Sequence, residues 1–121
     1  MKYTESHEWI MLEGETAVIG ITDYAQKELG EVVYVELPHV GHAVQAGEEA
    51  AVLESTKAAV DIYTPLSGTI AAVNTSLKTN PESVNHAAEG KGWLFQIRLS
   101  NPQELDVFMD KTTYLAYISK Q

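Results

Sequence analysis

Lys57 is the residue in this sequence whose surroundings most suggest a reactive role. It ends a short polar stretch, residues 54–57, between two runs of small and apolar residues, 50–53 and 58–63. Two apolar runs joined by a polar tip are typical of a β-hairpin, so we expect the lysine to project into solvent. An amine at such a tip can act as a nucleophile or base, or it can anchor a long prosthetic arm.

The acidic neighbours of Lys57 favour attachment over catalysis. A catalytic amine sheds its proton when it is buried or lies beside a cation. Here Glu54 and Asp61 flank the lysine, and Glu48 and Glu49 precede the hairpin. These negative charges favour the ammonium form. They do not hinder attachment, because an attaching enzyme can supply its own base. The residues alone also leave open an ordinary solvated lysine.

The elements around this hairpin are mostly strands. Apolar or alternating runs predict strands at residues 17–21, 32–37, 50–53, 58–63, 69–73 and 93–99. In the second of these strands, Val33, Val35 and Leu37 are expected on one face. A short helix is expected between Thr22, its N-cap, and Gly30, which follows its end.

The C-terminal part of the chain changes to helical spacing. Asn101 and Pro102 are typical of a helix start, and Glu104 completes an approximate capping box. Tyr114 and nearby apolar residues indicate that a helix continues or restarts after Asp110. We therefore expect one mostly β domain over residues 1–121, a compact barrel or sandwich with a helical segment at about 101–119.

Composition and charge exclude several classes of function. The chain has 121 residues, 45% hydrophobic and 21% charged, as in a single globular domain. Its formal charge of −9 disfavours binding to nucleic acid or an anionic membrane surface. Cysteine is absent, which excludes disulfides and thiolate zinc sites. His39 and His42 lack a third ligand, so no metal site is expected.

The sequence also carries no sign of membrane targeting. No apolar run approaches the ~20 residues of a membrane span. The first residues have no basic stretch followed by an apolar one, as a signal peptide would, and they are too acidic for a transit peptide. We therefore expect a cytoplasmic bacterial protein with no targeting segment in this chain.

Several blocks of the sequence resemble one known family. In chain order they are HEW at 7–9, GITDYAQ at 20–26, LGEVVYVELP at 29–38, ESTKA at 54–58, DIYTPLSG at 61–68 and GWL at 92–94. In this order, over nearly the whole chain, they resemble the glycine cleavage system H protein. The segment around Lys57 is similar to that family's lipoyl-attachment site. The resemblance implies a barrel-sandwich hybrid of the lipoyl/biotinyl type, with its lipoyl hairpin at about 50–63.

The resemblance implies a carrier without catalysis of its own. Lys57 would hold a covalent lipoate within an attachment motif formed by Glu54, Ser55, Thr56 and Ala58. The arm would take the aminomethyl group of glycine from the P-protein, a pyridoxal-phosphate decarboxylase, to the tetrahydrofolate-dependent T-protein. The L-protein, a dihydrolipoyl dehydrogenase, would reoxidise the arm, and a lipoate ligase or lipoyl transferase would attach it. Such a tether raises the effective concentration of the carried group at each partner.

The resemblance further implies a cleft for the loaded arm near Ser6, Glu8 and Asp61. A carboxylate there can be a hydrogen-bonding counter-ion for the carried amine. Three departures from the family are visible, and one of them is Glu28, where some members carry histidine, so the polarity of the cleft is expected to differ. Thr56 stands where valine is expected, a similar shape with which attachment should survive. Residues 85–90 read NHAAEG instead of a pattern close to Asn-x-x-Pro-Tyr-Gly, which predicts a looser loop.

Two alternatives remain open from the sequence. One is an H-like lipoyl relay, lipoylated at Lys57 but donating lipoyl groups to 2-oxo acid dehydrogenases or serving a redox role; the altered loop at 85–90 keeps this alternative open. The other is an interaction domain with an unmodified Lys57. A biotin carrier fits less well, because Thr56 and Ala58 replace the methionines that typically flank a biotinyl lysine.

Overall fold

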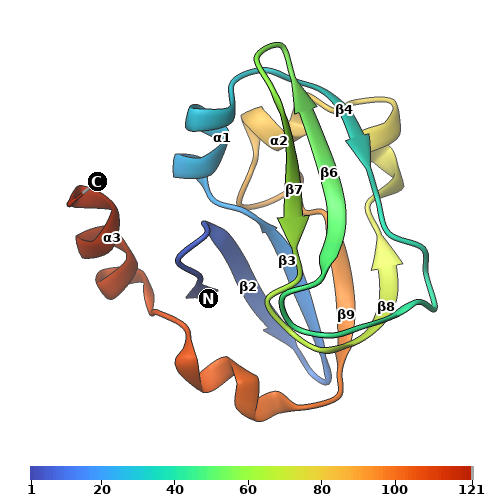
Figure 1. Ribbon diagram of the computed structural model, residues 1–121, viewed down its shortest axis with the longest axis vertical. Coiled ribbons are helices and arrows are strands. Elements are labelled where there is room, and N and C mark those ends of the chain that lie inside the picture. The colour runs from blue at the N-terminus through green and yellow to red at the C-terminus, as the bar shows by residue number, and fades with distance from the viewer. Residues whose placement is uncertain (121) are drawn as a thin grey trace.

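Two antiparallel sheets make up most of the computed structural model, which describes residues 1–120 (Figure 1). The larger sheet has six strands in the order β1-β2-β3-β9-β8-β5, and the smaller has three in the order β4-β6-β7. The strands are β1 (Lys2–Tyr3), β2 (Glu8–Glu13), β3 (Thr16–Ile21), β4 (Val32–Glu36), β5 (Ala43–Val44), β6 (Glu49–Ser55), β7 (Ala59–Tyr63), β8 (Gly68–Val73) and β9 (Phe95–Leu99). The helices are α1 (Asp23–Leu29), α2 (Ser83–His86) and α3 (Lys111–Ser119), with 3₁₀ helices η1 (Thr75–Lys78) and η2 (Pro102–Val107). The prediction of a mostly β fold with a C-terminal helix is confirmed.

The hydrophobic core contains residues of both sheets. Phe95 and Ile97 of β9 are completely buried, as their alternation predicts, and Leu53 of β6 joins them from the smaller sheet. A second cluster, in which Trp9 and Tyr114 are buried, lies where the N-terminal strands meet α3. The two clusters fix the larger sheet on both of its faces.

The predicted face of β4 is wrong at one residue. Val33 is exposed, whereas Val32 and Val35 are buried. The register of β4 against β6 shifts between Val32 and Tyr34, as at a β-bulge. Such a shift turns the strand's side chains over, so simple alternation fails there.

Helix α1 begins and ends where the sequence predicts. The Oγ1 atom of Thr22 accepts a hydrogen bond from the backbone N–H of Ala25 at 3.2 Å, which caps the helix. Gly30 follows the last helical residue with a φ of +87°, and its N–H donates to the carbonyl of Gln26. The helix is therefore held at both ends by local sequence signals.

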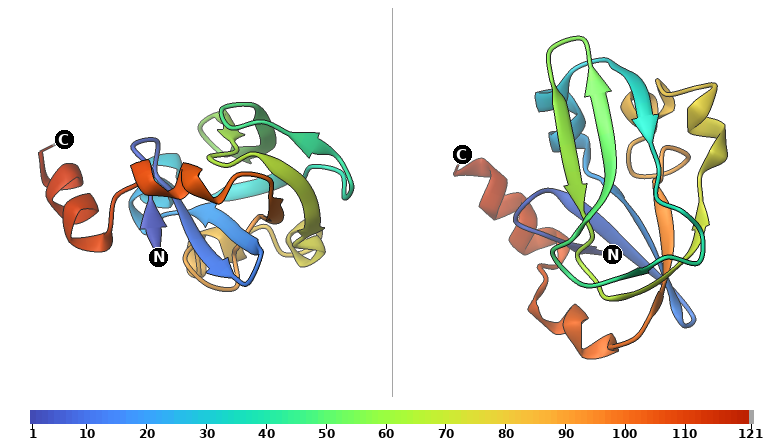
Figure 2. Two further views of the ribbon diagram at one scale, coloured as in Figure 1. Left: turned by 90° about the horizontal axis from the view of Figure 1, so that it is seen from below. Right: turned by 45° about the vertical axis from the view of Figure 1, so that its right-hand side comes forward.

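The C-terminal segment has two helical pieces. Asn101 caps η2 as predicted, but Glu104 forms no capping box: its carboxylate accepts hydrogen bonds from the N–H and Oγ of Ser67, at 2.7 and 2.8 Å. The helix restarts as α3, with Asp110 as its N-cap. Helix α3 extends away from the two sheets and lies beside the N-terminal segment (Figure 2).

Candidate functional site

The β6–β7 hairpin holds Lys57 at its tip, where the side chain is exposed. One side chain organises the turn: Ser55 Oγ accepts hydrogen bonds from the N–H groups of Lys57 and Ala58, both at 3.1 Å. The N–H of Thr56 donates to the carbonyl of Glu31 at 3.1 Å, which ties the tip to the corner between α1 and β4. The lysine thus stands on a fixed turn with its side chain exposed.

The remaining residues of the sequence motif also lie at this tip. Glu54 is exposed on β6, paired with Tyr34 of β4 on one side and Ala59 of β7 on the other. Thr56 and Ala58 are exposed as well. Because Thr56 is exposed, no packing contact at this position favours valine over threonine.

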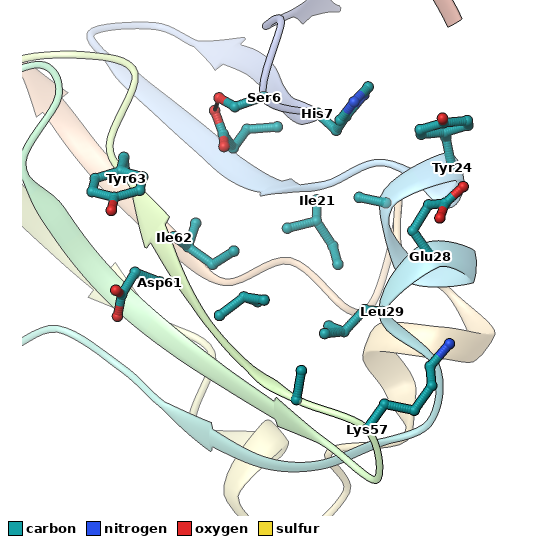
Figure 3. A pocket seen from close by; sticks show the side chains of 14 residues that line it. Ser6, His7, Ile21, Tyr24, Glu28, Leu29, Lys57, Asp61, Ile62 and Tyr63 are labelled. Atoms are coloured by element: carbon teal, nitrogen blue, oxygen red, sulfur yellow. Dashed lines mark hydrogen bonds between the residues drawn. The ribbon is translucent and has the colours of Figure 1, made fainter. Parts of the chain in front are cut away.

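A cleft of about 510 Å³ runs between α1 and β7, with Lys57 at one end (Figure 3). Its walls are mostly apolar, and Figure 3 shows Ile21, Leu29 and Ile62 between the lysine and Ser6 at the opposite end. The cleft exists because α1 and the hairpin stand apart at this edge of the sandwich. It suits an elongated guest with an aliphatic stem.

The far end of the cleft contains a buried carboxylate. Glu8 is only 4% exposed, and it accepts hydrogen bonds on Oε1 from Thr4 Oγ1 at 2.6 Å and Ser6 Oγ at 2.9 Å. Burial raises the pKa of Glu8 above its ordinary value, while the bonds from the two hydroxyls act in the opposite direction. Because both hydroxyls donate to Oε1, Oε2 can accept from a guest in the cleft.

The structure brings Ser6 and Glu8 together but leaves Asp61 apart. Ile62 is buried in β7, so Asp61, its neighbour in an alternating strand, is exposed, and Figure 3 shows the two side chains on opposite sides of the strand. Among the hydrogen bonds of residues 1–120, none joins Asp61 to Ser6 or Glu8. Asp61 therefore lies at the rim of the cleft.

Sequence reasoning missed Thr4 and Tyr24. Thr4 is 5% exposed and makes the shortest hydrogen bond to Glu8, and Tyr24 lines the cleft from α1. A threonine four residues before a glutamate in an irregular segment gives no signal of such a contact. Tyr24 follows a helix N-cap closely, but its direction depends on how α1 packs.

The loop that departs from the family pattern is well anchored. Asn85 accepts from the N–H of Val32 and donates to the carbonyl of Gly30, both at 2.8 Å. At the other end of α1, the carboxylate of Glu89 accepts from the N–H of Asp23 at 2.9 Å. The loop is therefore bonded to both ends of the helix that walls the cleft.

Fold and cleft together define a class of protein, the carrier domain: a small two-sheet sandwich that presents a hairpin lysine at the end of an apolar cleft. Within residues 1–120, no cluster of three or more His, Cys, Asp or Glu side chains could hold a metal ion. In the same residues, no helix has both the length and the apolar character needed to cross a membrane.

Comparisons with known proteins identify the family. The family model "Glycine cleavage H-protein" matches residues 1–121. Glycine cleavage system H proteins of Beijerinckia indica and Thermotoga maritima are 53% and 48% identical, covering 97% and 99% of this chain and 94% and 97% of their own lengths. The solved H protein of Mycobacterium marinum superposes with a TM-score of 0.88 at 33% identity, over 98% of this chain and 95% of that one.

The chain belongs to the glycine cleavage H-protein family, as the sequence resemblance indicates. The protein is accordingly a non-catalytic lipoyl carrier component of the glycine cleavage system, and its fold is the barrel-sandwich fold of its structural neighbour.

Proposed function

We propose that Lys57 is the lipoylated residue and that the protein carries the aminomethyl group of glycine on this arm from the P-protein to the T-protein. The observation that carries the proposal is the position of Lys57. It is exposed at a hairpin tip, at one end of an apolar cleft whose other end contains the buried carboxylate of Glu8. Lipoate, when bound, supplies a disulfide that is reduced to two thiols, one of which can hold the carried group.

The tip suits recognition by a lipoate ligase or lipoyl transferase. Ser55 and the backbone bond from Thr56 fix the turn, so the modifying enzyme meets one shape and not an ensemble. Glu54 and Ala58 are exposed on either side of Lys57 and complete the attachment motif. Because the lysine side chain packs little, its modification does not disturb the core.

The cleft residues fit the group that the arm would carry. Apolar walls of Leu29 and Ile62 suit the hydrocarbon stem of lipoate and exclude water from it. A primary amine at the end of the arm is cationic. Its N–H can donate a charge-assisted hydrogen bond to the Oε2 atom of Glu8. Ser6 holds that carboxylate in place, and Asp61 adds negative charge at the rim.

A free arm must also leave the cleft to visit its partners. We infer that the P-protein, the T-protein and the L-protein each meet the same exposed hairpin in turn, since each must reach the end of one tether. The tether keeps the carried group at high local concentration without releasing it. The protein contributes binding, orientation and shielding from water, while its partners contribute the catalysis.

Reconstitution tests this function. Lipoylated protein is mixed with P-, T- and L-proteins, glycine, tetrahydrofolate and NAD⁺, and glycine-dependent NADH formation is measured. We expect turnover with wild type and none with Lys57→Arg. Lipoylated protein that supports no turnover, yet donates its lipoyl group to a 2-oxo acid dehydrogenase, would contradict the proposal and favour the H-like relay.

A second arm of this experiment tests Glu8. Glu8→Gln keeps the shape of the side chain but removes its charge, and Glu13→Gln, at the exposed end of the same strand, is the matched control. We expect equal lipoylation of both variants and faster release of formaldehyde from the loaded Glu8→Gln arm. Water attack on the aminomethyl carbon breaks its bond to sulfur and yields formaldehyde, ammonium and the free thiol of the arm. Equal release from both variants would exclude Glu8 as the counter-ion.

A further inference from the structure

The phenol of Tyr114 lies where α3 meets the N-terminal turn and the start of α1, two segments that line the arm cleft. Its ring is 3% exposed, and its hydroxyl lies 2.9 Å from Nδ1 of His7 and 2.7 Å from Oγ1 of Thr22. His7 belongs to the N-terminal turn and Thr22 to the start of α1. One hydroxyl from outside the cleft therefore joins two of the segments that line it, the N-terminal turn and α1.

The His7 end of this link is an unusual piece of backbone. His7 has a φ of +73°, in the left-handed region that residues other than glycine rarely adopt. Its N–H donates to the carbonyl of Thr4 at 3.1 Å, and its carbonyl accepts from the N–H of Thr22 at 3.0 Å. A conformation of this kind persists only where the surroundings impose it. The turn through His7 brings Ser6 Oγ to the carboxylate of Glu8.

Aromatic contacts hold the His7 ring from two sides. The ring lies 4.7 Å from that of Tyr24 on α1 and 5.8 Å from that of Tyr114 on α3, measured between centroids. Figure 3 shows His7 and Tyr24 facing each other next to Ser6. The imidazole is thus packed between the helix that walls the cleft and the C-terminal helix.

The Thr22 end of the link is the N-cap of α1. Thr22 is fully buried, and its Oγ1 also accepts from the N–H of Ala25. The helix that begins there supplies Tyr24, Ala25 and Leu29 to the cleft wall. Any movement of Thr22 relative to His7 would shift α1 relative to Ser6 and Glu8 at the far end of the cleft.

The hydroxyl of Tyr114 can bond both neighbours at once. Burial raises the pKa of the phenol, so it keeps its proton. It then donates to one neighbour and accepts from the other, and the tautomer of His7 decides which. The ring is held in place independently, because Tyr3 stacks on it with 4.8 Å between ring centroids and 12° between ring planes.

We propose that Tyr114 is a positioning residue for the arm cleft: its hydroxyl holds the N-terminal turn that carries Ser6 and Glu8 at a fixed distance from α1. Tyr114 itself does not line the cleft and touches no guest within it. The inference rests on the proposed function, because it assigns a role in shielding the loaded arm. The proposal also assigns a function to α3, a helix that lies outside both sheets.

The variant Tyr114→Phe tests this by removing only the oxygen. Tyr3→Phe is the matched control, since it removes a hydroxyl from the stacked partner ring. Among the hydrogen bonds of residues 1–120, that hydroxyl makes only a long one, to the sulfur of Met1 at 4.0 Å. Both variants are lipoylated and loaded, and formaldehyde release is followed well below their melting temperatures. We expect unchanged lipoylation and faster release for Tyr114→Phe alone, by at least about fivefold, since fivefold is the effect of one of the two hydrogen bonds lost.

NMR spectra of the unmodified protein give a second readout. If Tyr114 only stabilised the fold, the shifts would not be confined to the residues named below. We expect Tyr114→Phe to shift the imidazole nitrogens of His7 and the amides of Ser6 and Glu8, and to leave the hairpin amides around Lys57 unchanged. Tyr3→Phe should leave the imidazole signals in place.

Three results overturn the inference. In the first, Tyr114→Phe releases formaldehyde at the wild-type rate, and its Ser6 and Glu8 amide signals are those of the wild type. Another is equally fast release from Tyr3→Phe, which would indicate general loosening of the aromatic cluster. The third is a shift spread over the hairpin as well. If wild type itself accepts no lipoate, the proposed function fails, and the His7, Ser6 and Glu8 signals still decide whether Tyr114 holds the turn.

Discussion

The side chain of Lys57 lies directly over the backbone of Gly30. A Cβ atom at Gly30 would stand 2.8 Å from Cε of Lys57 and 3.5 Å from its Nζ. Because Gly30 presents bare backbone, the stem of the lysine can lie across the corner between α1 and β4, at the entrance of the cleft. The residue that follows α1 therefore also leaves room for the stem of the lysine.

Replacing Gly30 by alanine should affect both stability and lipoylation. The φ of +87° is strained for alanine, which should cost about 1–3 kcal/mol of unfolding free energy. The added methyl group should also displace Lys57 and slow its lipoylation, as followed by mass spectrometry. Gly14→Ala is the control, because its φ is +63° and an added Cβ would meet nothing within 4 Å. Equal lipoylation rates for both variants would contradict this account.

Asn85→Ala should destabilise the corner that supports the lysine. It leaves the N–H of Val32 and the carbonyl of Gly30 without their side-chain partner. We expect the free energy of unfolding in urea to fall by about 1–3 kcal/mol. Asn80→Ala, an exposed asparagine in the same region, should change it by less than about 0.5 kcal/mol. Similar losses in the two variants would argue that Asn85 does not anchor α1.

Glu8 should make stability depend on pH in a definite direction. Burial raises its pKa in the folded state, so the folded protein holds the Glu8 proton more tightly than the unfolded chain does. This stabilising contribution is complete below the unfolded pKa of about 4.3 and is lost as the pH rises through the folded pKa.

The variant Glu8→Gln should lack this loss. Urea unfolding from about pH 4 to about pH 7 should therefore show its stability rising relative to wild type as the pH increases. Glu13→Gln, exposed on the same strand, should run parallel to wild type. If the curve for Glu8→Gln also runs parallel to wild type, burial does not raise the pKa of Glu8 in the folded protein.

Local signals made much of this fold predictable from the sequence. The caps at Thr22 and Asn101 were predicted because a cap depends on a side chain and amides within three residues of it. The end of α1 at Gly30 depends on one backbone angle. The alternation of Phe95 and Ile97 reflects the period of a strand. The family resemblance was confirmed because many such local blocks occur in one order.

Features that depend on distant contacts could not be predicted. Glu104 has the spacing of a capping box, but it bonds Ser67, which is 37 residues away. The bond between His7 and Tyr114 spans 107 residues. Asp61 lines the cleft only at its rim, apart from Ser6 and Glu8, because the burial of its neighbour turns it to the exposed side of β7. In each case packing, and not local preference, decides the direction of the side chain.

Intact mass after lipoylation tests the central claim most directly. Wild type and Lys57→Arg are co-expressed with a lipoate ligase and supplied with lipoate. Because Lys57 is exposed, both proteins should have the same melting temperature. The account predicts one lipoyl group on wild type and none on Lys57→Arg, although the other lysines remain in the variant. A lipoyl group on Lys57→Arg, or none on wild type, would contradict it.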